Sequence, residues 1–157
     1  MCLVNAPRHW HPDAPVMHAI PDVHDLMTPS LSLSAVLVVA LGGALGSMAR
    51  YVAGVLLMPA SGGFPVGTLV VNVLGAFLIG LFARLAIASE SEQLLRLALT
   101  TGFCGGFTTF STLSAETLTL VQEGRTARAV LYIACSLVLG LGATALGLLI
   151  VKPRVQP

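Results

Sequence analysis

The stretch TGFCGGFTTFST, residues 101–112, decides how the whole chain is interpreted. It holds three glycines, five Ser or Thr residues and three phenylalanines, and it carries no charge. It lies midway along an apolar segment, about residues 94–122, that is long enough as a helix to cross roughly 30 Å of hydrocarbon. Gly105 and Gly106 disfavour helix and two β-branched threonines follow, so we expect the helix to break here.

A broken helix inside lipid frees backbone carbonyls at the end of its first half and N–H groups at the start of its second half. Protein, water or ions must then satisfy these groups. The carbonyl end carries a negative dipole that suits a cation, whereas the N–H end suits an anion. Two interpretations stay open: a glycine kink that serves packing alone, or a break that builds a cation site and an anion site.

The composition indicates an integral membrane protein. The 157 residues are 55% hydrophobic and 10% charged, and the mean hydropathy is +0.89. Soluble domains carry roughly 25% charged residues, so this charge content with long apolar runs favours a membrane protein. A net charge of +1 gives no basic patch for nucleic acid. No motif or carboxylate pair indicates an enzyme, and the three cysteines have no ligand-like spacing.

Apolar segments recur through the chain and predict an all-α membrane protein with four transmembrane helices, the third of them broken near its middle. The expected helices cover about residues 31–58, 66–84, 94–122 and 129–151. Their links are short, which implies antiparallel neighbours in one bundle. Residues 31–157 are therefore interpreted as one transmembrane domain.

Residues 1–30 differ from the rest of the chain. They contain all four histidines, all three aspartates and five of the nine prolines. No apolar run in this range is long enough for a signal peptide. We expect a disordered tail, and Met27 offers an alternative start of the protein.

An even number of helices places both termini on one side of the membrane. That side is expected to carry Arg8, Arg84, Arg96, Lys152 and Arg154, and the other side Arg125, Arg128 and, if it reaches that surface, Arg50. This difference in positive charge orients the chain only weakly. The chain is therefore a candidate for insertion both ways up, which permits an antiparallel homodimer; the alternative is a single orientation.

Five polar residues within the apolar segments are candidates for function. Asn72 either forms an interhelical hydrogen bond or offers its amide to an anion. Arg50, set among glycines spaced by four, either reaches the membrane interface or lines an aqueous vestibule. Glu116 marks an ion pathway or a buried pair, for which Arg50 is the natural partner. Tyr132 and Ser136 share one face of the fourth helix, where hydroxyls often bond to their own backbone.

Three segments together resemble the CrcB/Fluc family of small fluoride channels: GGALGSMARY (42–51), GTLVVNVLG (67–75) and TGFCGGFTTFSTLSAE (101–116). The resemblance covers about residues 33–151. It implies a passive fluoride channel in the bacterial inner membrane that exports fluoride and lowers its toxicity in the cytoplasm. It further implies an antiparallel, dual-topology homodimer with a structural sodium ion on the dimer axis.

The resemblance also implies roles for individual positions. Asn72 matches a pore asparagine, and Phe110 matches a pore phenylalanine whose electropositive ring edge contacts fluoride. Gly105 and Thr108 match positions whose backbone carbonyls hold sodium, so two subunits would supply four oxygens. Arg50 matches a vestibule arginine and Glu116 a pathway glutamate. Hydroxyl groups beside the pore are implied at Thr109, Ser111, Thr112, Tyr132 and Ser136.

The chain departs from the family pattern at two positions. Leu113 stands where a second pore phenylalanine is common, and Gly140 stands where a second hydroxyl can occur in the fourth helix. The first departure removes one aromatic edge and bears on the conduction rate more than on the fold. Two other functions are alternatives for a small membrane protein of this kind. A small multidrug exporter coupled to protons needs a carboxylate deep in the first helix, and residues 31–58 contain none. A membrane scaffold that transports nothing would not require these polar residues to coincide with a glycine-rich break.

Overall fold

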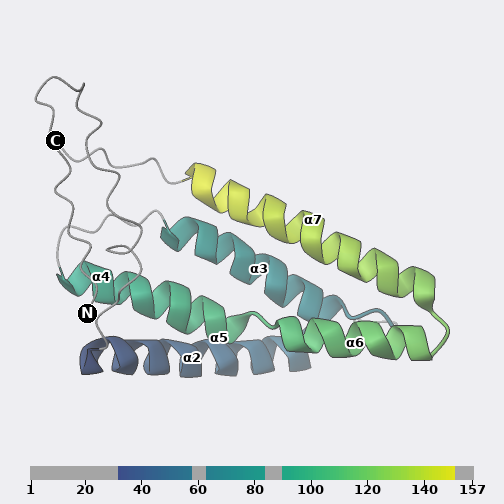
Figure 1. The fold of residues 1–157 in the computed structure, drawn as a ribbon, viewed down its shortest axis with the longest axis horizontal. Helices are drawn as coiled ribbons and strands as arrows, with labels where there is room; N and C mark the ends of the chain where they lie inside the picture. Colours follow the sequence, from purple (N-terminus) through teal and green to yellow (C-terminus); the bar gives the residue numbers. More distant parts are fainter. Residues whose placement is uncertain (1–31, 58–62, 84–89, 151–157) are drawn as a thin grey trace, which may run out of the picture. The chain divides into compact units, whose positions relative to one another are not determined.

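The computed structural model describes residues 32–57, 63–83 and 90–150, and every regular element in these ranges is helical (Figure 1). The prediction of an all-α protein is therefore confirmed, whereas the expected tail of residues 1–30 lies outside the described residues. The elements are α2 (Leu33–Leu57), α3 (Val66–Ala83), α4 (Glu90–Leu97), the π-helical η2 (Ala98–Cys104), α5 (Gly105–Phe107), α6 (Phe110–Gln122) and α7 (Thr126–Ile150).

Helices α2, α3 and α7 are each long and apolar enough to cross a membrane. Their outer surfaces carry many exposed large hydrophobic side chains, such as Leu41, Leu141 and Leu149. Water would disfavour so much contiguous apolar surface, whereas lipid accommodates it. Figure 1 shows the chain from α4 to α6 running between α2 and α3, with α7 on the far side of α3.

Backbone-to-backbone contact joins α2 to η2 and α5. A Cβ atom added at Gly46 would overlap the carbonyl oxygen of Phe103, and one added at Gly106 would overlap the carbonyl oxygen of Gly43. Gly42 and Gly102 face the same interface, where an added Cβ would also meet backbone atoms. These glycines therefore let the two helical segments approach closely, as small residues do in membrane bundles.

Glycines also allow α3 and α7 to pack backbone to backbone. An added Cβ at Gly80 would overlap the carbonyl oxygen of Thr144, and one at Gly147 would overlap that of Phe77. The Thr144 hydroxyl donates to the carbonyl of Ala76 at 3.0 Å, which adds a hydrogen bond across the helices. Close packing and one polar contact thus hold α7 against α3.

Two extended residues separate α5 from α6. Thr108 has φ −78° and ψ 157°, and Thr109 has φ −150° and ψ 110°. Gly105 and Gly106, which we expected to disfavour helix, lie inside α5. That expectation was wrong at these positions, because Gly106 is held in a helical turn against α2 and serves close packing instead.

The turn from α6 to α7 is a Schellman motif around Gly124, which has φ +75°. The N–H of Arg125 donates to the carbonyl of Leu120 at 2.8 Å, and that of Gly124 donates to Val121 at 3.0 Å. Glycine suits this left-handed position because it has no Cβ. The tight turn brings α7 back beside α6 and places Tyr132 opposite Glu116.

Candidate functional site

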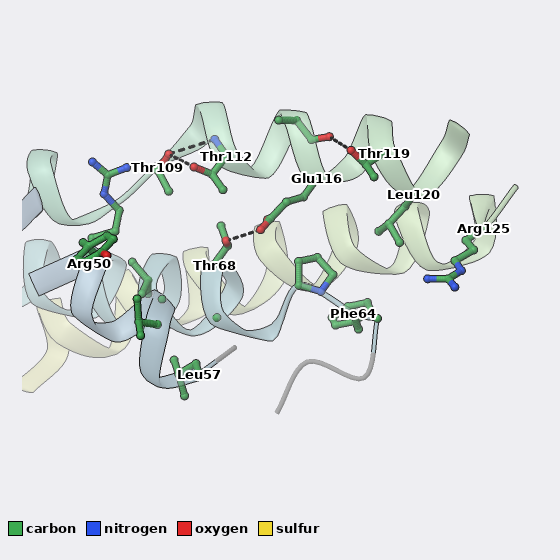
Figure 2. Close-up of a pocket in the computed structure, with 18 of the residues that line it drawn as sticks. Arg50, Leu57, Phe64, Thr68, Thr109, Thr112, Glu116, Thr119, Leu120 and Arg125 are labelled. Atoms are coloured by element: carbon green, nitrogen blue, oxygen red, sulfur yellow. Dashed lines mark hydrogen bonds between the residues drawn. The ribbon is translucent and has the colours of Figure 1, made fainter. Parts of the chain in front are cut away.

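A cavity of about 640 Å³ opens between α2, α3 and α6 and ends beside the extended residues (Figure 2). The polar side chains in its wall come from three helices that are far apart in the sequence. Arg50 comes from α2, Thr68 from α3, and Thr109, Thr112 and Glu116 from the start of α6 or just before it. Polar groups from separate helices converge here within an otherwise apolar bundle.

The side-chain amide of Asn72 replaces the backbone partners that Thr109 lacks. The Thr109 N–H donates to Asn72 Oδ1 at 2.8 Å, and Asn72 Nδ2 donates to the carbonyl oxygen of Thr109 at 3.1 Å. This reciprocal pair satisfies both backbone groups of an extended residue within the bundle. Asn72 therefore makes the interhelical hydrogen bond considered from the sequence, directed at the backbone next to α6.

Arg50 binds the carbonyl end of α5. Its Nε donates to the carbonyl oxygen of Gly106 at 3.1 Å, and Ser47 Oγ donates to the same oxygen at 3.4 Å. The expected pairing of Arg50 with Glu116 was wrong, because the guanidinium is used by a carbonyl that α5 leaves free at its C-terminal end.

Glu116 is held by two hydroxyl groups. Thr68 donates to Glu116 Oε1 at 2.9 Å and Tyr132 donates to Oε2 at 2.7 Å. Tyr132 is fully buried, and its ring packs edge-on against Phe64 at a centroid distance of 5.6 Å. The carboxylate therefore faces the cavity with fixed orientation and without a cationic partner among the contacts of the described residues.

Thr109 organises the first turn of α6. Its hydroxyl accepts from the N–H of Thr112 at 3.1 Å and donates to the Thr112 hydroxyl at 2.9 Å. It also lies 3.1 Å from the hydroxyl of Ser111. This is the N-cap arrangement, which satisfies one free N–H of the helix. The N–H groups of Phe110 and Ser111 belong to the same helix start, where the dipole favours negative charge.

A second cavity, of about 620 Å³, lies on the other side of the extended residues. Its polar lining includes Arg96, Thr100, Thr101 and Thr144, and it reaches Gly105 and Thr108. Within the described ranges, the carbonyl oxygens of Gly105 and Thr108 accept no hydrogen bond. Thr108 and Thr109 thus contribute to different cavities, Thr108 to the second and Thr109 to the first.

A sequence model of the family described as CrcB-like protein, Camphor Resistance (CrcB), matches residues 37–148. The chain belongs to the CrcB-like family. The match covers more than half of the chain and contains all the cavity residues named above.

Several curated proteins similar to this CrcB-like chain bear the name fluoride-specific ion channel FluC. One from Thermus thermophilus is 54% identical over 112 residues, which cover 71% of this chain and 90% of the relative. One from Bordetella petrii is 50% identical over 78% of this chain and 94% of the relative. One from Methylobacterium radiotolerans is 43% identical over 74% and 84%, respectively.

The CrcB-like chain brings most of the expected site residues together, although Phe110 and Ser136 stand apart. Phe110 is 80% exposed and does not line either cavity described above. The Ser136 hydroxyl donates to the carbonyl of Tyr132 at 2.7 Å, the local bond that is common for hydroxyls in membrane helices. Leu113 packs against the cluster of Leu120, Ala129 and Tyr132, and an added Cβ at Gly140 would meet open space.

Thr68 is the main site residue that the sequence reasoning missed. It precedes Asn72 by four residues on α3, so the two side chains lie on one helix face. That spacing is a signal that could have identified it. Ser47 was also missed, and it lies three residues before Arg50, which is again the spacing of helical neighbours.

Proposed function

We infer that this chain is a fluoride-specific ion channel, a multi-pass protein of the bacterial inner membrane that lets fluoride leave the cytoplasm down its electrochemical gradient. The observation that carries this inference is the identity of about half of all aligned residues with proteins named fluoride-specific ion channels, over nearly their full length. An ion channel of this kind is not an enzyme. Its export of fluoride lowers the toxicity of fluoride in the cytoplasm.

We propose that the elements from α4 to α6 form a third transmembrane segment, which makes four with α2, α3 and α7. Two features support a break in the middle of this segment. The first is that Thr108 and Thr109 are extended. The second is that side chains of other helices bind the backbone here: Asn72 binds that of Thr109, and Arg50 binds the carbonyl of Gly106. A non-helical backbone at membrane depth is tolerated where protein or an aqueous cavity surrounds it.

In the proposed pathway, fluoride exchanges its hydration waters for protein donors beside the break. The hydroxyls of Thr109, Ser111 and Thr112 lie there, with the amide of Asn72 and the N–H groups at the start of α6. Thr68 and Glu116 continue the polar surface away from the break, Tyr132 holds Glu116 in place, and Ser136 lies one turn further along α7, back toward the level of the break. Arg50 supplies positive charge next to this surface, which favours an anion over a cation.

We further propose that two copies, inserted in opposite orientations, complete the channel. Phe110 supports this, because an aromatic residue 80% exposed directly after the break is free to contact a second copy. Other exposed residues near the break are Gly105 and three that carry hydroxyl groups, Thr101, Ser111 and Ser114. Hydroxyl groups are more favourably placed at a protein interface than in lipid. The ring edge of Phe110 would then be available to fluoride, since it carries the positive part of the quadrupole.

The same arrangement fits a structural sodium ion. Backbone carbonyls suit hard cations, and those of Gly105 and Thr108 accept no hydrogen bond in the described part of the chain. They also belong to the carbonyl end of α5, where the helix dipole favours a cation. Gly105 and Thr108 of two copies would supply four oxygens, and the bound ion would hold the two breaks together.

Fluoride efflux from proteoliposomes tests the proposed function. Vesicles loaded with potassium fluoride and given valinomycin are expected to release fluoride, recorded with a fluoride electrode, whereas vesicles loaded with potassium chloride release little chloride. Vesicles without protein control for leakage. Absence of fluoride efflux, or chloride efflux at the same rate, would overturn the proposal.

A further inference from the structure

The far end of the first cavity, away from the break, carries its own group of charges. Figure 2 shows Arg50 at one end of the lining and Arg125 at the other, with Glu116 between them. Arg125 and Glu123 both line the cavity, in the turn between α6 and α7. Residues 121–128 are all exposed, so this end of the cavity is the end that meets solvent.

Contacts across the mouth hold these charges in place. Arg125 Nη1 lies 3.1 Å from Glu123 Oε2, and both side chains are 47% exposed. Arg128 Nη1 donates to the carbonyl oxygen of Gly63 at 3.5 Å, which ties the α6–α7 turn to the loop before α3. A Cβ added at Gly63 would lie 3.1 Å from Arg125 Nη1 and 3.4 Å from Arg128 Nη1. Both guanidinium groups therefore sit against the same short stretch of backbone.

The charges of this group do not cancel. Two arginines face one glutamate, so one positive charge remains at the mouth. A net charge of one sign at the mouth of a cleft raises the local concentration of the opposite ion and the rate at which it enters. Because Arg125 and Glu123 are half exposed, salt should screen their effect strongly.

We propose that Glu123, Arg125 and Arg128 form a charged collar that concentrates small monovalent anions at the mouth of the cavity, with Glu123 moderating the attraction. This inference rests on the proposed function, because the anion that enters is then fluoride. The collar acts on the entry of the ion. The groups beside the break, in contrast, act on the loss of its hydration water.

Opposite charge changes at the collar give opposite results. Arg125→Gln should lower the initial rate of fluoride efflux at least about twofold at 10 mM salt, and Glu123→Gln should raise it by a similar factor. Arg125→Lys keeps the charge and should retain most of the rate. Both effects should disappear near 1 M salt, where the Debye length falls to about 3 Å. Unchanged rates at low salt, or changes that persist at high salt, would refute the collar.

A thiol-labelling experiment tests the collar without fluoride transport. Thr119 lines the cavity and is exposed, so Thr119→Cys places a thiol inside the field of the collar. An anionic methanethiosulfonate should react faster there than a cationic one, and Arg125→Gln should lower the ratio of the two rates at least about threefold at 10 mM salt. The parent chain controls for its native cysteines.

The two experiments separate the inferences. A chain that passes no fluoride but keeps the charge-dependent labelling ratio would refute the proposed function and retain the collar. A chain that passes fluoride normally, with a labelling ratio that Arg125→Gln does not change, would refute the collar alone.

Discussion

Helix α7 and the segment from α4 to α6 both contain three glycines, yet their backbones differ. Helix α7 runs unbroken over 25 residues through Gly140, Gly142 and Gly147. The other segment passes through a π-helical stretch and then two extended residues. Its glycines are all in helical elements, and the extended residues are threonines.

The difference lies in which neighbours are available to the backbone. Asn72 on α3 pairs with the N–H and carbonyl of Thr109, and Arg50 and Ser47 on α2 bind the carbonyl of Gly106. In α7, by contrast, the hydroxyl of Ser136 donates to the carbonyl one turn earlier in the same helix, and Thr144 donates both to such a carbonyl and to that of Ala76 on α3. Within the described residues, no side chain of another helix binds a backbone group of α7. An extended backbone is stabilised here because other helices offer it hydrogen-bond partners, and glycine content alone does not produce it.

The largest effect should come from removing the partner of Thr109. Asn72→Ala leaves the N–H and the carbonyl oxygen of Thr109 without these hydrogen bonds, at about 1–3 kcal/mol for each buried group. We expect fluoride efflux to fall at least about tenfold, which corresponds to about 1.4 kcal/mol. The measurement is initial efflux from proteoliposomes matched for protein content.

Asn72→Asp serves as the control for this change. An ionised aspartate keeps the acceptor for the Thr109 N–H but cannot donate to the carbonyl oxygen. If Asn72→Ala left efflux near normal, the amide would not be what maintains the open backbone. The contrast with α7 would then need another explanation.

The next largest effect is expected from glycine substitutions, which test whether close packing distinguishes the two regions. Gly106→Ala would push a methyl group into the carbonyl of Gly43, whereas Gly142→Ala on α7 would meet nothing within 4 Å. We expect the first change to lower the free energy of unfolding by about 1–3 kcal/mol through overpacking. The second should raise it by up to about 1 kcal/mol, because alanine favours helix. Thermal unfolding in detergent measures both, and equal shifts would show that close packing at Gly106 is not needed.

A smaller effect is expected where α7 contributes to the cavity. Tyr132→Phe removes the hydrogen bond to Glu116 but keeps the ring that packs on Phe64, so about 0.5–1.5 kcal/mol should be lost. Thr68→Val removes the donor to the other carboxylate oxygen and should act similarly. We expect efflux to fall about twofold to tenfold in each case. If neither variant changed efflux, the orientation of Glu116 would not matter for conduction.

The smallest effect should come from Ser136→Ala. The Ser136 hydroxyl donates only to the carbonyl of Tyr132 among the hydrogen bonds of the described residues. Its loss should change the free energy of unfolding by less than about 0.5 kcal/mol, because a hydroxyl that bonds back to its own helix adds little to stability. Efflux should stay within about twofold of the parent chain. A large loss of efflux would show that the Ser136 hydroxyl contributes more to the proposed pathway than this local bond indicates.

Several features could be predicted from the sequence because they depend on local patterns. Apolar runs of sufficient length predicted the helical class, and α2, α3 and α7 begin and end close to the ranges expected from hydropathy. Asn72, Arg50 and Glu116 could be identified as candidate functional residues because a polar group inside an apolar run needs a partner. These inferences need only the residue type and its place in the segment.

The partners themselves could not be predicted in this way. Arg50 meets a backbone carbonyl 56 residues away, and Glu116 meets hydroxyls on two other helices. Charge complementarity favoured an Arg50–Glu116 pair, but a carbonyl at a helix end competes for the same guanidinium. Which of the two is nearer depends on how α2 crosses α5, and helical periodicity carries no information about that crossing.

The exposed ring of Phe110 also has a consequence for how activity depends on the amount of protein in the membrane. If a second copy must cover this ring, channels form by encounters between chains that diffuse in two dimensions. The number of channels then rises with the square of the surface density of chains when they are sparse, and linearly when they are crowded. Activity per chain would thus depend on the ratio of lipid to protein.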